Sequence, residues 1–127
     1  MLLASNLSFS RKDRIIFQKL YISLPPKKII HIQGRNGIGK TTLIKVLTNL
    51  LIPLSGEIYW NGKNIRKNLN EFYSNLTYIM DKNTSKNELT VRENINYWIK
   101  LFSSKVKLNE INSILDILNL SKYKNAP

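Results

Sequence analysis

Three glycines, a lysine and a threonine stand close together in the run GRNGIGKT at residues 34–41. A glycine, four residues, a second glycine, a lysine and a hydroxyl residue form the spacing with which a chain can wrap around a polyphosphate. Glycine lets the backbone approach closely and turn its N–H groups inward, and the lysine adds a point charge for the β- and γ-phosphates. The run therefore predicts a phosphate-binding loop for a nucleoside triphosphate.

The predicted ligand contacts come from this loop and the residue that follows it. Lys40 is the candidate catalytic residue, because its ammonium would meet the β- and γ-phosphates. The Thr41 hydroxyl is the candidate Mg²⁺ ligand. We therefore expect ATP and Mg²⁺ as cofactors, and the candidate ATP-binding residues are Gly34, Asn36, Gly37, Ile38, Gly39, Lys40, Thr41 and Thr42.

A loop of this kind needs a strand before it and a helix after it. The β-branched run at residues 29–32 predicts a buried central strand. Apolar residues at helical spacing from Leu43 to Leu51 predict a helix that Pro53 stops. Such a helix would direct its positive N-terminal end at the bound anion.

The other segments predict a mixture of strands and helices from their apolar periodicity and turn residues. The helix near residue 90 has a capping box, with Thr90 and Glu93 at the required spacing. The predicted elements are two or three antiparallel strands before Pro25 with a basic turn at 10–14, a strand at 57–60 with an Asn-Gly hairpin, a strand at 76–80, and helices over 90–102 and 109–120.

The composition is strongly basic, with 20 Lys and Arg residues against 8 Asp and Glu and a net charge of +12. Such an excess can indicate a nucleic-acid partner. The charges are scattered, and lysine, isoleucine and asparagine are all abundant, as A/T-rich codons produce, so we predict no nucleic-acid partner. The absence of cysteine excludes disulfides and thiolate metal sites. No segment approaches the about 18 apolar residues of a membrane span, and we expect no targeting segment before the fold.

Beyond the loop, the run TTLIKVLTNLLIPLSGEIYWNG at residues 41–62 resembles the ABC ATPase family. In that family the P-loop helix is followed by a proline, a Ser-Gly-Glu turn, a strand and an Asn-Gly hairpin. LTVRENI at residues 89–95 is similar to the segment that opens the family's helical subdomain. The resemblance implies an α/β fold and part of an ABC ATPase domain: an antiparallel β-subdomain (1–28), a P-loop NTPase core (29–80), and a coupling loop with the start of a helical subdomain (81–127).

The resemblance also implies a function, that of an ABC-type ATPase subunit that binds Mg-ATP to power export. Its partners would be a transmembrane transporter subunit and a second ATP-binding subunit, and the loop Asp81–Glu93 would contact the first of these. It would lie peripherally on an inner membrane, on the cytoplasmic side in a bacterium or the matrix side in a mitochondrion. Within the family, TVRENINYW and the short interval before Thr90 are most similar to the haem exporter of cytochrome c maturation.

The sequence departs from the family pattern in several places. No glutamine follows residues 76–80, where Asp81 either contacts the metal through water or is a solvated loop acid. Near position 11 the family has an aromatic residue that stacks on adenine. Here Arg11 could stack through its guanidinium or Phe9 could substitute, and the alternative is that each of the two residues is structural or exposed.

The sequence also contains no LSGGQ-like signature, no apolar strand that ends in Asp-Glu, and no histidine after the loop. Three functions of a P-loop chain remain open: an ATPase completed by another polypeptide, a truncated, non-hydrolysing ATP-binding or regulatory fragment, or a small P-loop kinase. A basic nucleic-acid binder is the alternative that the scattered charges disfavour.

Overall fold

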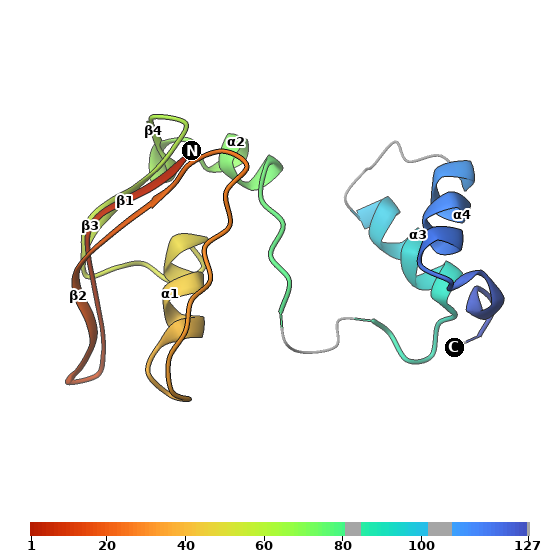
Figure 1. Ribbon diagram of the computed structural model, residues 1–127, viewed down its shortest axis with the longest axis horizontal. Helices are drawn as coiled ribbons and strands as arrows, with labels where there is room; N and C mark the ends of the chain where they lie inside the picture. The colour runs from red at the N-terminus through yellow and green to blue at the C-terminus, as the bar shows by residue number, and fades with distance from the viewer. Residues whose placement is uncertain (81–84, 102–107, 127) are drawn as a thin grey trace. The chain divides into compact units, whose positions relative to one another are not determined.

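The computed structural model describes residues 1–80, 85–101 and 108–126. The chain divides into two compact units, Met1–Ile79 and Met80–Pro127 (Figure 1). Each unit has its own secondary structure and is described by itself. The finer division at residues 28 and 80 stays a prediction.

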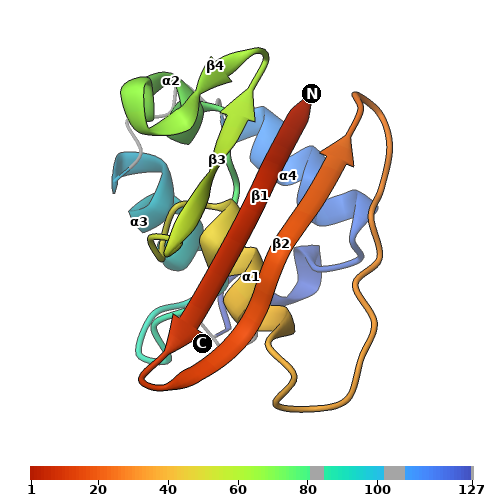
Figure 2. The same ribbon diagram turned by 90° about the vertical axis from the view of Figure 1, so that its left-hand side faces the viewer.

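A four-stranded antiparallel sheet forms the first unit, with the strand order β2-β1-β3-β4 (Figure 2). The strands are β1 (Leu2–Arg11), β2 (Arg14–Leu24), β3 (Ser55–Trp60) and β4 (Lys63–Asn64). The predicted N-terminal strands and the Asn-Gly hairpin are confirmed. Lys12 takes a φ of 53° in the tight turn between β1 and β2, the left-handed conformation that short hairpin turns need.

Helix α1 (Lys40–Leu47) packs against one face of this sheet (Figures 1 and 2). Its fully buried Val46 shares a core with Ala4 and Leu7 of β1 and with Ile58 of β3. Burial of these side chains in place of exposure contributes roughly 1.5–3 kcal/mol for each of the larger ones. The core thereby fixes the helix that follows the glycine loop.

The end of α1 differs from the prediction that it runs on until Pro53. Asn49 has a φ of 57°, and the Leu50 N–H donates to the Lys45 carbonyl at 2.8 Å. These features make a Schellman motif, in which a left-handed residue closes the last turn. The helix therefore ends at Leu47, and the apolar residues after it belong to the following turn and loop.

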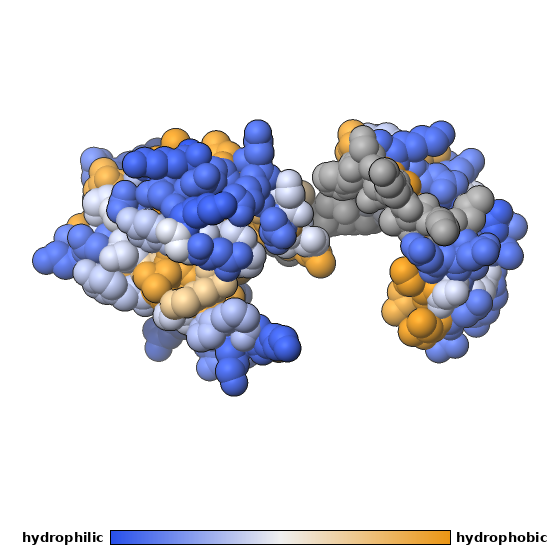
Figure 3. All heavy atoms as spheres, turned by 90° about the horizontal axis from the view of Figure 1, so that it is seen from above, coloured by the Kyte–Doolittle hydropathy of each residue, from blue (hydrophilic) through white to orange (hydrophobic). Residues whose placement is uncertain are grey.

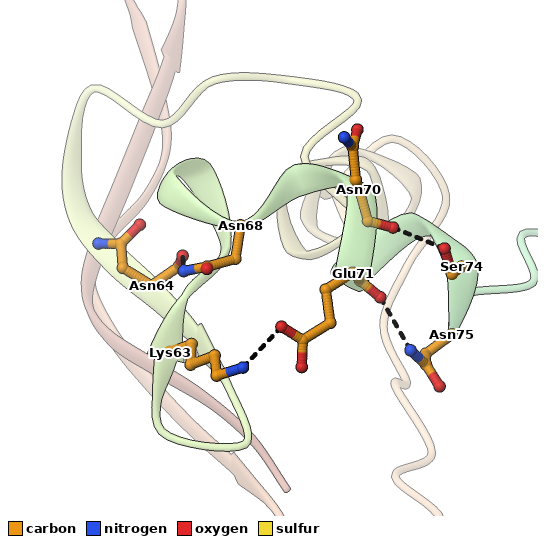
Figure 4. A network of polar contacts seen from close by, with 7 residues as sticks. All are labelled: Lys63, Asn64, Asn68, Asn70, Glu71, Ser74 and Asn75. Atoms are coloured by element: carbon orange, nitrogen blue, oxygen red, sulfur yellow. Dashed lines mark hydrogen bonds and ion pairs between the residues drawn. The ribbon is translucent and has the colours of Figure 1, made fainter.

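A short helix, α2 (Leu69–Ser74), follows the 3₁₀ turn η1 (Ile65–Lys67) and was not predicted. Six residues are too few for a helical period to show in the sequence. The helix is held by buried Phe72 and by a polar network (Figure 4), in which the Lys63 ammonium lies 2.7 Å from a Glu71 carboxylate oxygen. The exposed ion pair adds at most about 1 kcal/mol, so the burial of Phe72 is the larger contribution.

The predicted strands at 29–32 and 76–80 are wrong. Neither segment has a regular structure, and Ile29 is 95% and Ile79 is 86% exposed. A strand forms only where its backbone N–H and C=O groups pair with a neighbouring strand. Within the described residues the sheet contains only β1 to β4, so these β-branched runs have no pairing partner there.

The second unit contains α3 (Val91–Leu101), α4 (Leu108–Ile117) and the 3₁₀ turn η2 (Ser121–Tyr123). Both predicted helices are confirmed, although Phe102, which was expected to extend the first, lies outside the described residues. The N–H groups of Val91 and Arg92 donate to the carbonyls of Ala126 and Lys124, at 3.0 and 3.1 Å. The C-terminal segment therefore satisfies donors in the first turn of α3 that have no acceptor within the helix.

Apolar side chains interrupt the largely hydrophilic surface of both units (Figure 3). In the second unit Ile117 is 79% exposed, whereas Ile111 and Leu115 on the same helix are buried. No helix among the described residues combines the length and apolarity that crossing a bilayer requires.

Replacing Gly56 with alanine is expected to lower the free energy of unfolding by about 2–4 kcal/mol. Gly56 has a φ of 92°, and an added Cβ would lie 2.5 Å from the carbonyl oxygens of Ser5 and Asn6 in β1. Gly62→Ala is the matched control, because Gly62 also has a positive φ of 79° but no atom within 4 Å of the added carbon. Urea denaturation measures both variants, and an equal loss in the two would contradict the steric explanation.

Candidate phosphate-binding site

The glycine loop leads directly into the first turn of α1. Gly39 has a φ of 113° and occupies the N-cap position of the helix, and its carbonyl accepts the Leu43 N–H at 2.8 Å. An added Cβ at Gly39 would lie 2.3 Å from Cγ2 of Ile16 in β2. The loop backbone is therefore pressed against the β1–β2 hairpin, and a residue without a side chain is required at that point.

The Lys40 side chain folds back over the loop. Its Nζ donates to the carbonyl oxygens of Gly34 at 2.7 Å and Arg35 at 3.0 Å. The ammonium has three N–H donors, so one is left for a ligand. The other two can exchange their carbonyl acceptors for phosphate oxygens. The Lys40 ammonium thus lies against the carbonyls at the start of the loop.

A cavity of about 730 Å³ lies between the loop and the turn of the β1–β2 hairpin. This volume is in the range of small-molecule sites. The hairpin contributes the lining residues Arg11, Lys12, Arg14 and Ile16, and the loop and α1 contribute Asn36, Gly37, Gly39, Lys40, Thr41 and Thr42.

The structure thus brings together most of the residues that the sequence proposed. Gly34 and Ile38 are not in the lining. An added Cβ at Gly34 would lie 3.0 Å from Cγ2 of Ile38, so the Ile38 side chain lies beside Gly34. Gly34 instead takes part through its carbonyl, which holds Lys40 in place.

Lys12, Arg14 and Ile16 line the cavity although the sequence singled out Arg11 alone. The sequence did contain a signal, because a tight turn makes its flanking residues cross-strand neighbours. Arg11 and Arg14 are such a pair in the hairpin.

The cavity is electropositive. Arg11, Lys12, Arg14 and Lys40 all line it, and no carboxylate among the described residues does so. In residues 1–80, 85–101 and 108–126 the sole ion pair joins Lys63 and Glu71, so none of the four cations is neutralised by such a pair. Uncompensated charge around a concave surface concentrates anions there.

Aromatic stacking is absent from the described lining of the cavity. Phe9, the proposed substitute for an adenine-stacking residue, packs against Phe17 with ring centroids 6.0 Å apart and contributes to the sheet core. That alternative is therefore wrong. Arg11 does line the cavity, and a guanidinium plane can stack on an aromatic base.

Thr41 lines the cavity and stands at the position whose hydroxyl binds Mg²⁺ in a phosphate-binding loop. Mg²⁺ that arrives with substrate phosphates usually also has one or two carboxylate ligands and several waters, and no carboxylate among the described residues lines the cavity. No group of three or more His, Cys, Asp or Glu residues that could hold a metal alone occurs in the described part of the chain. Asp81, the proposed water-mediated contact, lies outside the described residues.

In the second unit, the described part of the proposed coupling loop is tied to α3. The side chain of Asn94 accepts the Lys86 N–H at 2.8 Å and donates to the Lys86 carbonyl at 3.0 Å. The capping box is formed, because the Thr90 N–H donates to Glu93 at 2.8 Å and the Glu93 N–H donates to the Thr90 hydroxyl at 3.2 Å. Residues 85–93 are therefore anchored to the first turn of the helix.

This capping box is expected to weaken in acid. Hydrogen bonds from the Thr90 backbone and hydroxyl lower the pKa of Glu93 below its ordinary value of 4.5. Its stabilising contribution is complete above that ordinary value and is lost as pH falls through the lowered pKa of the folded state. Amide chemical shifts of Thr90 and Asn94 should therefore change below pH 4.5, and Glu93→Gln should remove that dependence. A pH dependence that survives in the variant would contradict this assignment.

A glycine loop that enters a helix at a lysine, beside a cationic cavity, is the arrangement of a P-loop protein. Residues 17–127 match the ABC transporter family, and the chain belongs to that family. It is 32% identical over its full length to the "Cytochrome c biogenesis ATP-binding export protein CcmA" of Vibrio vulnificus (strain YJ016), of which it covers 62%.

A second curated protein and a solved structure are also similar to this chain. The protein of the same name from Dechloromonas aromatica (strain RCB) is 42% identical over 95 residues, which are 75% of this chain and 47% of that protein. A solved structure of the ATP-binding subunit of an ABC transporter matches with a TM-score of 0.78 at 20% identity, over 98% of this chain and 53% of that one. The fold is thus the predicted α/β fold of these subunits, and the chain spans less than two thirds of the relatives' length.

Proposed function

We propose that this chain is the ATP-binding subunit of an ABC transporter and that it binds Mg-ATP at residues 34–42. The observation that carries the proposal is the placement of Lys40, whose ammonium lies over the loop at 2.7 Å from the Gly34 carbonyl and lines a cationic cavity. A triphosphate is the ligand that needs this combination of a cation, glycine N–H groups and a helix N-terminus.

Each residue has a distinct role in this proposal. The N–H groups of Asn36, Gly37 and residues 39–42 would surround the β- and γ-phosphates, and Lys40 would exchange its carbonyl acceptors for phosphate oxygens. Thr41 would hold Mg²⁺ through its hydroxyl, and the ion would supply positive charge to offset the charge on the transferred phosphoryl group. Gly34 and Ile38 shape the loop from outside the cavity.

The transported cargo is proposed to be haem or a related component of cytochrome c maturation. The support is that the relatives named above are cytochrome c biogenesis ATP-binding export proteins. The partners would be a transmembrane subunit, contacted by the loop at residues 81–93, and a second ATP-binding subunit. The chain would lie peripherally on an inner membrane, on the cytoplasmic side as in a bacterium, and a mitochondrial matrix location has no support from these bacterial relatives.

A second candidate is ATP binding without efficient turnover by this chain alone. It is favoured because no carboxylate among the described residues lines the cavity, whereas phosphoryl transfer to water needs a group that orients the nucleophile. The ATPase function would then require acidic residues other than those of the described cavity lining.

Two measurements on the same preparation test these proposals. Calorimetric titration with ATP in the presence of Mg²⁺ should show saturable binding, and phosphate release by the chain alone should not exceed the rate in buffer. Failure to bind ATP would contradict the proposed function. Turnover that depends on Lys40 in the isolated chain would contradict the second candidate and leave the first in place.

A further inference from the structure

An asparagine followed by a glycine occurs at two places in the sequence, Asn36-Gly37 in the glycine loop and Asn61-Gly62 in the β3–β4 hairpin. We propose that Asn36 is a site of spontaneous deamidation, that this modification weakens phosphate binding by the loop, and that a bound triphosphate protects the site. The effect on binding rests on the proposed function, whereas the modification itself does not.

Deamidation at such a pair begins when the backbone nitrogen of the glycine attacks the side-chain carbonyl carbon of the asparagine. A bond forms between that nitrogen and Cγ, and the Cγ–Nδ2 bond breaks. The side-chain nitrogen takes up the proton that the backbone nitrogen loses and leaves as ammonia. Water then opens the cyclic imide at one of its two carbonyls and leaves aspartate or isoaspartate. Glycine favours the attack, because a residue without a side chain lets the backbone rotate.

The Asn36-Gly37 pair is exposed and has few contacts that would oppose this rotation. The pair forms the centre of a turn closed by a long hydrogen bond, from the Ile38 N–H to the Arg35 carbonyl at 3.3 Å. Across residues 1–80, 85–101 and 108–126, the Asn36 side chain and the Gly37 N–H have no hydrogen-bond partner. A Cβ added at Gly37 would meet no atom within 4 Å, so there is room for the imide ring.

The charge of the cavity favours the same reaction. Asn36 and Gly37 line the cavity together with four cations, and no carboxylate among the described residues belongs to that lining. The attacking nitrogen and the carbonyl oxygen carry negative charge in the transition state, and positive groups nearby stabilise it. The cations that are proposed to attract phosphate therefore also favour loss of the Asn36 amide.

The Asn61-Gly62 pair provides a comparison within the same chain. It is exposed too, but it forms the two-residue turn between β3 and β4, with φ values of 49° and 79°. The Asn61 side-chain oxygen accepts a hydrogen bond from the N-terminal ammonium at 2.7 Å, and the Asn61 N–H donates to the Met1 carbonyl at 2.9 Å. Attack at Asn61 must therefore disturb contacts that Asn36 does not have.

The product would place a negative charge where the phosphates are expected. A carboxylate at position 36 repels the anion and can pair with a cation of the lining, which is then lost to the ligand. Isoaspartate also lengthens the backbone of the loop by one carbon and displaces the N–H groups that follow. A triphosphate that is already bound would accept a hydrogen bond from the Gly37 N–H, so the attacking nitrogen is occupied.

The test follows deamidation at both pairs in the full chain during incubation at mildly alkaline pH. Peptide mass spectrometry measures aspartate and isoaspartate at residues 36 and 61, with and without inorganic tripolyphosphate. In the absence of this anion, Asn36 should react at least about tenfold faster than Asn61, whose side chain must first lose a charge-assisted hydrogen bond. Tripolyphosphate at about ten times its Kd should slow the reaction at Asn36 about tenfold and leave Asn61 unaffected. Equal rates at the two pairs would overturn the inference.

Variants connect the modification to binding. Asn36→Asp reproduces the charge of the product and should bind tripolyphosphate at least about fivefold more weakly than the wild type, from the repulsion of adjacent unit charges even in water. Asn36→Gln closes its larger ring slowly, so after incubation it should keep its own starting affinity while the wild type loses affinity in step with deamidation. Asn61→Gln is the matched control and should lose affinity as the wild type does. An equal loss in Asn36→Gln would overturn the link to binding.

Failure of this inference and failure of the proposed function give different results. Tripolyphosphate binding without faster deamidation at Asn36, or without protection there, would overturn the inference and leave the phosphate site in place. If fresh wild-type chain binds neither Mg-ATP nor tripolyphosphate, the proposed function is wrong and the effect on binding is overturned with it. Rapid deamidation at Asn36 in that chain would still support the modification itself.

Discussion

Replacing Lys40 with alanine is expected to weaken ATP binding by about 30- to 150-fold, equivalent to about 2–3 kcal/mol for a charged hydrogen bond. The phosphates lose a cation in a cavity whose lining has no carboxylate among the described residues. The hydrogen bonds from Lys40 to the carbonyls of Gly34 and Arg35 belong to the ligand-free state, so their loss does not itself weaken binding. Calorimetric titration with Mg-ATP measures the change.

Lys45→Ala is the matched control for this variant. Lys45 lies in the last turn of the same helix, outside the described cavity lining, and its loss changes the net charge equally. Its affinity for ATP should stay within about threefold of the wild type, since exposed charges at a distance are screened by salt. Equal losses in the two variants would show that general electrostatics, and not a contact of Lys40, account for binding.

Replacing Gly39 with alanine is expected to weaken ATP binding by about 10- to 100-fold. A side chain at a φ of 113° is strained, and its Cβ would lie 2.3 Å from Cγ2 of Ile16. Backbone strain of this kind costs about 1–3 kcal/mol. The loop must move away from the hairpin, which separates the phosphate-binding groups from the rest of the cavity.

The double variant Ile16→Ala/Gly39→Ala separates the two causes. It removes the collision and keeps the strained backbone, so it should recover part of the lost affinity but not all of it. Tripolyphosphate titration gives the contribution of the phosphates without that of the base and ribose. If Gly39→Ala binds ATP as tightly as the wild type, the loop has room for a side chain at this position, which contradicts the steric explanation.

Local chemistry made several elements predictable from the sequence. The turn at Asn61-Gly62 and the capping box of Thr90 and Glu93 depend on residues a few positions apart, and both are formed. The loop at residues 34–41 was located in the same way, because glycine and lysine spacing encodes the shape of the turn. Each of these features is determined by residues close together in the sequence and not by contacts with distant segments.

Features that depend on distant residues could not be predicted in this way. The β-branched run at 29–32 has the propensity of a strand but no described pairing partner, and Ile29 is almost fully exposed. β-propensity measures how well a residue fits a pleated, half-buried surface. It does not indicate whether a neighbouring strand is present to form that surface. The position of Arg14 and Ile16 beside the loop likewise depends on the packing of the hairpin.

The most direct test of the central claim is a titration of backbone amide chemical shifts with inorganic tripolyphosphate. Because the anion would be held by main-chain N–H groups, the largest shift changes should fall on residues 36–42, and in Lys40→Ala they should require about 30- to 150-fold more tripolyphosphate. Shift changes that fall mainly outside this segment, or none at all at saturating tripolyphosphate, would contradict the account.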